Sequence, residues 1–156
     1  MSAFSQTRNV ELSTLYYLET QIAANWTGIT LVKSFSSAYD QTLPVVCVQL
    51  VGAMTDRLEI GSTTLQNYYE IAIDVFATSD GQRIDLADFI LNQLKAGWIY
   101  YTHSKVSGAT TLTKVAAGRI TVTEFSDNSK IDLGDEVANP DRFRHFLRIY
   151  TRVGLS

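Results

Sequence analysis

The sequence contains little of what marks disulfide scaffolds, fibrous chains or membrane proteins. Its 156 residues include one cysteine, Cys47, and two prolines. A single cysteine cannot form an internal disulfide, which excludes a small scaffold held together by disulfides. Two prolines and nine glycines exclude collagen-like and low-complexity chains. The apolar stretches are a few residues long, far short of the ~20 residues that a membrane-spanning helix needs.

The rest of the composition is that of a globular protein. Apolar residues make up 46% of the chain and charged residues 19%, and the formal net charge is −3. This balance excludes wholesale disorder, and the length fits a single domain covering residues 1–156. The N-terminal residues lack the basic start and apolar core of a signal peptide. We therefore expect one soluble, cytoplasmic domain.

Helical spacing of apolar residues predicts a first helix from Asn9 to about Asn25. Asn9 is the expected N-cap, and Gly28 is expected to end the helix because glycine adopts a left-handed backbone easily. The side chains expected to form its core-facing stripe are Leu12, Leu15, Tyr16, Glu19, Ile22 and Ala23.

A second helix is predicted from Gln82 to about Ala96. Ser79 or Asp80 can cap its beginning, and Gly97 is expected to end it. The expected apolar stripe consists of Ile84, Ala87, Ile90, Leu91 and Leu94.

Alternating or β-branched segments predict several strands. Strands are expected over residues 29–35, 45–52, 57–60, 66–78, 98–102, 119–125 and 142–153. Residues 45–52 are apolar on both faces, which favours a central strand. Because the strands come in runs and do not alternate strictly with helices, we expect an α+β fold. Its sheet would be mostly antiparallel, with two amphipathic helices packed on one face.

Three segments have features that point away from simple core packing. Residues 104–117 are small and rich in hydroxyls, which predicts either a flexible loop or a long hairpin arm. Residues 126–141 are expected to form an acidic, turn-rich connection. In the strand at 66–78, Glu70 and Asp74 lie on a half-polar face, which we expect to meet another surface.

The sequence offers few residues for catalysis. A nucleophilic site needs a serine or cysteine together with a base and an orienting acid. Cys47 lies within an apolar run, where cysteine usually behaves as a small buried hydrophobe. His145 shares its predicted face with Leu147 and Ile149, which favours a core or interface position, and His103 follows the aromatic strand. We therefore assign no catalytic residue.

No cofactor or metal site is predicted either. The glycine-rich motifs G-x-G-x-x-G and G-x-x-x-x-G-K-[ST], which bind nucleotides, are missing from the sequence. The acidic residues after the strand at 119–125 faintly resemble a calcium loop, but they lack the D-x-[DN]-x-[DN]-G order. A solvated acidic loop is the favoured interpretation of Asp127, Asp132, Asp135 and Glu136.

The last predicted strand concentrates positive charge on one face, and six acidic residues lie between positions 124 and 141. The positive charge comes from arginines of the strand at 142–153. These arginines could pair with Glu70 and Asp74 on a neighbouring strand, form a charged subunit interface, or approach a nucleic acid backbone. The net charge of −3 disfavours tight binding to nucleic acid. The residues of this face are Arg142, Arg144, Arg148 and Arg152.

The order of these segments resembles the tail terminator (tail completion) proteins of long-tailed bacteriophages. The resemblance rests on a helix followed by PVVCVQLVG, and on NYYEIAIDVFATSD running directly into the helix RIDLADFILNQL. The aromatic segment WIYYTH and the closing strand RFRHFLRIYTRV complete it, so that the resemblance covers most of the chain.

The resemblance implies an α+β structural protein of the virion without catalytic residues. Such a subunit forms a hexameric ring on the finished tail tube, stops tube polymerisation and presents the surface that docks to the head-side connector. Its partners would be further copies of the chain, the major tail tube protein and the head-completion protein, with genomic DNA passing through the channel. It would lie at the head–tail junction of the virion, after assembly in the host cytoplasm.

A ring needs two different patches that meet between neighbouring copies. The arginine face of the last strand, the acidic segment before it and the half-polar face of residues 68–76 are candidates for these patches. The candidate interface residues are Arg142, Arg144, Arg148, Arg152, Glu70, Asp74, Asp132, Asp135 and Glu136.

Three other functions stay open at this point. The chain could be another neck, head-completion or tube-joining protein of a phage. It could be a small hydrolase or transferase built around His103 or His145. It could also be a cytoplasmic ligand-binding domain with a pocket beneath the aromatic strand.

Overall fold

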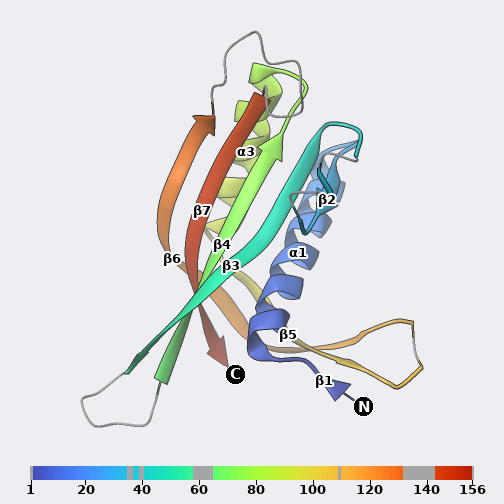
Figure 1. Cartoon of the computed structure of the whole chain (residues 1–156), viewed down its shortest axis with the longest axis vertical. Coiled ribbons are helices and arrows are strands. Elements are labelled where there is room, and N and C mark those ends of the chain that lie inside the picture. The colour runs from blue at the N-terminus through green and yellow to red at the C-terminus, as the bar shows by residue number, and fades with distance from the viewer. Residues whose placement is uncertain are drawn as a thin grey trace.

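The computed structural model describes residues 2–34, 37–38, 41–57, 65–108, 110–131 and 143–155. Within these ranges, two long helices and seven strands follow one another along the chain (Figure 1). In order they are β1 (Ser2–Ala3), α1 (Gln6–Asn25), β2 (Thr30–Val32), β3 (Val45–Arg57), β4 (Leu65–Phe76), α3 (Asp80–Leu94), β5 (Trp98–Lys105), β6 (Thr113–Ile131) and β7 (Arg144–Leu155).

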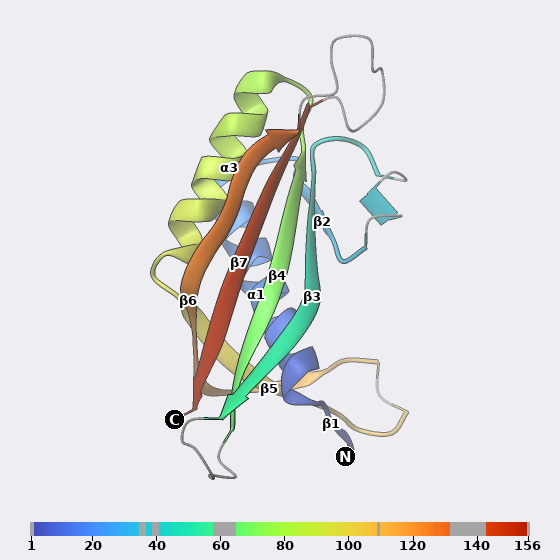
Figure 2. The same ribbon diagram turned by 60° about the vertical axis from the view of Figure 1, so that its left-hand side comes forward.

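The strands form one sheet in the order β1-β5-β6-β7-β4-β3-β2. All neighbouring pairs are antiparallel except β2 and β3, which run parallel. The predicted α+β class is confirmed, and the prediction of a mostly antiparallel sheet holds except for this pair. Figure 2 shows the sheet curving around the helices as half of a barrel. The three residues of β2 carry no sequence pattern that could have predicted that β2 runs parallel to β3.

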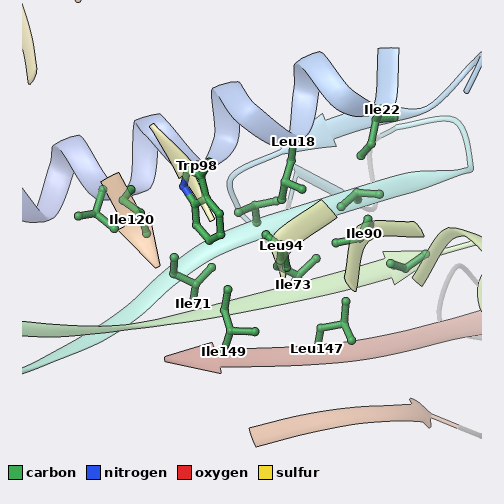
Figure 3. Packing of buried hydrophobic residues seen from close by; sticks show 14 of the residues in the cluster. Leu18, Ile22, Ile71, Ile73, Ile90, Leu94, Trp98, Ile120, Leu147 and Ile149 are labelled. Atoms are coloured by element: carbon green, nitrogen blue, oxygen red, sulfur yellow. The ribbon is translucent and has the colours of Figure 1, made fainter. Parts of the chain in front are cut away.

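Both helices pack against the same face of the sheet, called the inner face below. Side chains from the two helices meet side chains from the central strands in one buried cluster (Figure 3). Each fully buried leucine or isoleucine of this kind stabilises the fold by ~1.5–3 kcal/mol. This cluster therefore holds the helices on the sheet. Its labelled members are Leu18, Ile22, Ile71, Ile73, Ile90, Leu94, Trp98, Ile120, Leu147 and Ile149.

The first helix begins earlier than predicted and buries a different face. Its N-cap is Ser5 and not Asn9, and the Ser5 side chain accepts a backbone N–H of the first turn at 3.3 Å. Of the predicted stripe, Ile22 is buried and Leu12 and Leu15 are half-buried. The exposed members of that stripe are Tyr16, Glu19 and Ala23. The residues that α1 does bury are Asn9, Val10, Ser13, Thr14, Leu18 and Ile22.

Polar side chains on the buried face of α1 explain this difference. Thr14 Oγ1 donates to Val10 O at 2.8 Å and accepts from the Trp98 indole N–H at 3.2 Å. Ser13 Oγ accepts from the Tyr101 backbone N–H at 2.9 Å. Because these hydroxyls are hydrogen-bonded, burying them carries little penalty. A count of apolar residues treats them as surface positions and so selects the wrong face.

The second helix agrees closely with its prediction. It begins at Asp80 after the N-cap Ser79, whose Oγ accepts from the Gln82 N–H at 3.2 Å. Gly97 follows it with a φ of 74°, and Gly28 follows α1 with a φ of 75°, which confirms both glycines as helix ends. The predicted stripe members Ala87, Ile90 and Leu94 are buried, and Ile84 and Leu91 are half-buried.

β3 is longer than predicted and does not lie at the centre of the sheet. It continues to Arg57, so the prediction of a separate strand starting there is wrong, and residues 58–60 lie outside the described residues. Its neighbour β2 pairs only with Val45–Cys47. The strand is apolar on both faces because a second small cluster buries Val45 and Cys47 on the side away from the helices.

β6 is one long strand that covers parts of three segments predicted separately. It contains the strand predicted at 119–125, the end of the 104–117 segment and residues 126–131 of the predicted acidic connection. Residues 104–117 thus belong to a hairpin of β5 and β6, which is one of the two expected alternatives; their flexibility stays a prediction. The prediction of a turn-rich connection is wrong for 126–131, because an exposed polar strand shows no apolar alternation. Residues 132–141 lie outside the described residues.

The other strands lie where the sequence places them, with different ends. β2 covers three of the residues predicted at 29–35, and Phe35 lies outside the described residues. β4 takes up most of the segment predicted at 66–78, and β5 extends the aromatic strand to Lys105. β7 begins at Arg144, two residues later than predicted.

Neither of the two long helices described is both long and apolar enough to cross a membrane.

Candidate functional site

The face of the sheet away from the helices, called the outer face below, carries three of the four predicted arginines. β7 lies beside β4 in antiparallel register, so alternate side chains of the two strands share this face. Along β7 the buried residues alternate with half-buried ones, as the predicted two-faced pattern requires. The residues of β7 on the outer face are Arg144, Phe146, Arg148, Tyr150 and Arg152.

Arg144 forms a buried ion pair with Asp74 of the neighbouring strand. Its Nε and Nη2 donate to Asp74 Oδ1 at 2.9 and 2.7 Å. The Asp74 side chain is completely buried, and that of Arg144 is 19% exposed. Charge-assisted bonds of this kind are stronger away from water, and a buried carboxylate without them would be costly. The pair therefore helps to hold β7 against β4.

Arg148 forms a second, more exposed pair with Glu70. The distance from Arg148 Nε to Glu70 Oε1 is 2.9 Å, and the two side chains are 37% and 23% exposed. Four of the candidate interface residues are thus brought together as two pairs within one chain, which is one of the three expected alternatives. Arg152 is exposed further along β7. The candidates outside the described residues are Arg142, Asp132, Asp135 and Glu136.

The second small cluster lies beside the buried pair. Ala38, Val45, Cys47 and Phe76 form it, and Cys47 lies opposite Asp74 in the register of β3 and β4. Burial, and then the negative charge of Asp74, raise the pKa of Cys47 to about 11. The thiol is therefore protonated at neutral pH and a poor nucleophile. The prediction that Cys47 is a buried hydrophobe is confirmed.

Both histidines are buried and hydrogen-bonded to asparagines. The His103 backbone N–H donates to Asn9 Oδ1 at 3.0 Å, and His103 Nδ1 lies 3.1 Å from the same oxygen. His145 Nε2 lies 2.6 Å from Asn128 Oδ1, and His145 is buried, in agreement with the prediction of a core or interface position. Burial lowers the pKa of both imidazoles. Within the described part of the chain, neither ring is hydrogen-bonded to a serine, threonine or cysteine side chain.

A polar cluster that the sequence did not indicate lies at the beginning of α3. Arg83 is buried in this helix and forms an ion pair with Asp80, which also binds Lys130 Nζ at 3.2 Å. Arg83 Nη1 donates to the backbone carbonyls of Ile131 and Arg144, each at 3.3 Å. These bonds tie the helix to one end of β6 and of β7. The one signal in the sequence was an arginine next to the apolar stripe of the predicted helix.

A hollow of about 430 Å³, called the aromatic hollow below, opens between α1, β5 and the turn before β5. Tyr17 stacks on Trp98 with ring centroids 5.6 Å apart, and Tyr16 meets Tyr101 edge-on at 5.7 Å. Arg119 of β6 also lines it. The hollow lies beside the aromatic strand, where a ligand pocket was one of the open alternatives.

A second, smaller hollow of about 190 Å³ lies on the outer face and is called the methionine hollow below. It spans four strands, because residues of β3, β4, β6 and β7 contribute to it. Met54 is 54% exposed, which is unusual for a methionine. The lining residues are Met54, Tyr68, Thr123, Glu124 and Tyr150.

Neither metal ligands nor similarity to known proteins indicates what the protein does. Within the ranges that the structure describes, no three histidine, cysteine or carboxylate side chains are grouped so that they could hold a metal ion. No protein-family model and no curated protein matches the chain. The function has to be argued from the outer face and the two hollows.

Proposed function

We propose that the chain is a structural subunit of a bacteriophage tail: a tail terminator that caps the tail tube and stops its polymerisation. It would act as a hexameric ring at the head–tail junction and present the docking surface for the head connector. Its partners would be the major tail tube protein and the head-completion protein. It would carry out no catalysis, and genomic DNA would pass through the ring without sequence-specific contacts.

The observation that carries this proposal is the one-sided cover of the curved sheet. Both long helices pack on the inner face (Figure 2), while the outer face presents paired charges and a hollow with an exposed methionine. An open, curved and chemically mixed surface of this kind suits contacts with other protein subunits. By contrast, the three side chains that were considered for catalysis are buried. Cys47 lies in an apolar cluster, and the rings of His103 and His145 are each hydrogen-bonded to one asparagine.

The order of the elements also supports the proposal. The segments on which the resemblance rests correspond to β3, to β4 leading into α3, to β5 and to β7. β3, β4 and β7 lie side by side in the sheet although residues 77–143 separate β4 from β7 in the chain.

Negative-stain electron microscopy tests the proposal. The purified chain is mixed with tubes assembled from the major tail protein of a long-tailed phage, and tubes alone serve as the control. We expect extra density at one end of each tube and an arrest of tube growth. Binding along the tube wall, or no binding, would contradict the proposal. Density only on isolated connectors would favour the neck or head-completion alternative.

A ligand-binding domain is the second candidate, favoured by the aromatic hollow. Its volume and aromatic walls are in the range of small-molecule sites. Arg119 beside these walls favours an aromatic carboxylate as the ligand. A thermal-shift screen with aromatic carboxylates tests this candidate, because a ligand at 100 times its Kd stabilises the fold by ~2.7 kcal/mol. No shift with any of them would argue against it.

A further inference from the structure

The aromatic hollow is positively charged at its edge. Lys114 Nζ lies 2.9 Å from the centroid of the Tyr16 ring and 4.9 Å from that of Tyr101. Arg119 Nη2 donates to two backbone carbonyls of the turn before β5, at 2.6 and 3.3 Å. Within the described part of the chain, neither cation forms an ion pair with a carboxylate. Aromatic walls thus stand beside two positive charges that are not paired with any acid of the described ranges.

The methionine hollow has the complementary character. The exposed Met54 side chain lines it together with Glu124, whose carboxylate forms no ion pair with any described residue. The rings of Tyr68 and Tyr150 complete its walls. An exposed thioether therefore stands beside a negative charge that has no ionic partner in the part of the chain that the structure describes.

The two hollows lie on opposite sides of the sheet. The aromatic hollow is formed with α1, which lies on the helix side of the sheet (Figure 2), whereas the methionine hollow is lined by residues of the outer face. Two different patches on opposite sides of one subunit can join copies head to tail, and such a contact can close into a ring.

We propose that a second copy of the chain occupies the aromatic hollow through its methionine hollow. Met54 of one copy packs among the rings of Tyr16 and Tyr101 of the next, because a thioether binds favourably against aromatic rings. Glu124 of the first copy meets Lys114 of the second, and this charge pair fixes the orientation of the two copies. The inference rests on the proposed function, since it supplies the contact between subunits of the ring.

Site-directed cross-linking tests the contact. One preparation carries Met54→Cys and the other carries Tyr16→Cys, and the mixture is treated with a short bis-maleimide, both free and on tail tubes. The native Cys47 is buried and does not interfere. The matched control combines Met54→Cys with Asp85→Cys, an exposed position of α3 outside both hollows. We expect at least a tenfold higher yield of covalent dimer for the first mixture.

Charge exchange in the same assay tests the orientation. Adding Lys114→Glu to the Tyr16→Cys chain places two carboxylates in the contact and should lower the yield about tenfold. Adding Glu124→Lys to the Met54→Cys chain as well restores opposite charges, and we expect the yield to recover to within about threefold of the original. Both side chains are exposed, so unchanged circular dichroism serves as the folding control.

The outcomes separate this inference from the proposed function. Equal yields in the test and control mixtures, in solution and on tubes, would overturn the inference, even if the chain caps tubes normally. A high yield that is lost and restored by the charge changes supports the inference, even if no tube is capped. Occupation of the aromatic hollow by a tube protein instead would appear as cross-links from Tyr16→Cys to that protein alone, and this result would also overturn the inference.

Discussion

At the residue scale, the two ion pairs of the outer face share their chemistry but differ in burial. Arg144–Asp74 is withdrawn from water, whereas Arg148–Glu70 remains partly hydrated. Removing one partner of a buried pair leaves a charge without its counter-charge in a low-dielectric setting, while an exposed pair is screened by water and salt. The structure therefore assigns very different weights to two contacts that the sequence presents as equivalent.

The first prediction compares alanine substitutions of the two acids. Asp74→Ala should destabilise the fold by ~3–5 kcal/mol, because Arg144 loses the oxygen that accepts two of its hydrogen bonds. Glu70→Ala should cost at most ~1 kcal/mol. Urea denaturation followed by circular dichroism measures both. Equal losses for the two variants would show that burial does not set the strength of these pairs.

The second prediction concerns pH. Burial lowers the pKa of His103 and of His145 in the folded chain, so the unfolded chain binds protons first as the pH falls. The contribution of the two histidines to stability is therefore fully present above pH ~6.5, which is the pKa of histidine in the unfolded chain. It is lost as the pH falls from there towards the pKa in the folded chain. Thermal melts at pH 7.5 and 5.5 should show a lower Tm at the lower pH.

The matched control for this pH effect is the double variant with His103→Gln and His145→Gln. Its Tm should change much less over the same interval, because the pKa of Asp80 is lowered by its hydrogen bond with Arg83 and that group titrates at more acidic pH. If the double variant kept the full pH dependence, other groups would have to be responsible for it.

Single residues differ in how far the sequence could place them. The burial of Cys47 and His145 followed from their apolar neighbours in the alternating strands. The burial of Asn9, Ser13 and Thr14 did not, because their hydrogen-bond partners lie about ninety residues away or depend on helix geometry. Local patterns report the polarity of a side chain but not whether a distant donor or acceptor will satisfy it.

At the element scale, strands and helix ends were easier to predict than faces. β7 alternates between half-buried and buried residues as far as Thr151, so its buried face follows directly from the sequence. α1 has apolar residues on most of its circumference, so periodicity alone could not select the side that meets the sheet. Its exposed Tyr16 then becomes part of the aromatic hollow. One residue of the misplaced stripe, Tyr16, therefore lies in the proposed contact between copies.

The third prediction uses the two glycines that end the helices. Both have a positive φ, so alanine costs ~1–2 kcal/mol of backbone strain at either position. At Gly28 an added Cβ meets no atom within 4 Å, whereas at Gly97 it would lie 2.6 Å from the carbonyl oxygen of Ile120. Gly97→Ala should therefore destabilise the fold clearly more than Gly28→Ala in urea denaturation. Similar losses would mean that β5 and β6 can move apart without cost.

At the scale of the whole molecule, the net charge of −3 conceals an uneven distribution. Some of the charged side chains form ion pairs with one another on the outer face and at the beginning of α3. Lys114, Arg119 and Glu124 stay without ionic partners among the described residues, and they border the two hollows or line them. Charges left over after internal pairing are the ones available to orient a second subunit.

The fourth prediction distinguishes internal pairs from contacts between subunits. In the double variant Glu70→Arg with Arg148→Glu, the charges are exchanged and the pair is kept, so its stability should lie within ~1 kcal/mol of the original chain. If this pair serves the fold alone, the variant should cap tail tubes as the original chain does. Lys114→Glu, which should fold equally well, should lose most capping because it reverses a charge in the proposed contact. Negative-stain images of both variants with tubes provide the measurement. Normal capping by Lys114→Glu together with failure of the exchanged pair would place the subunit contact on the arginine face of β7, and not between the two hollows.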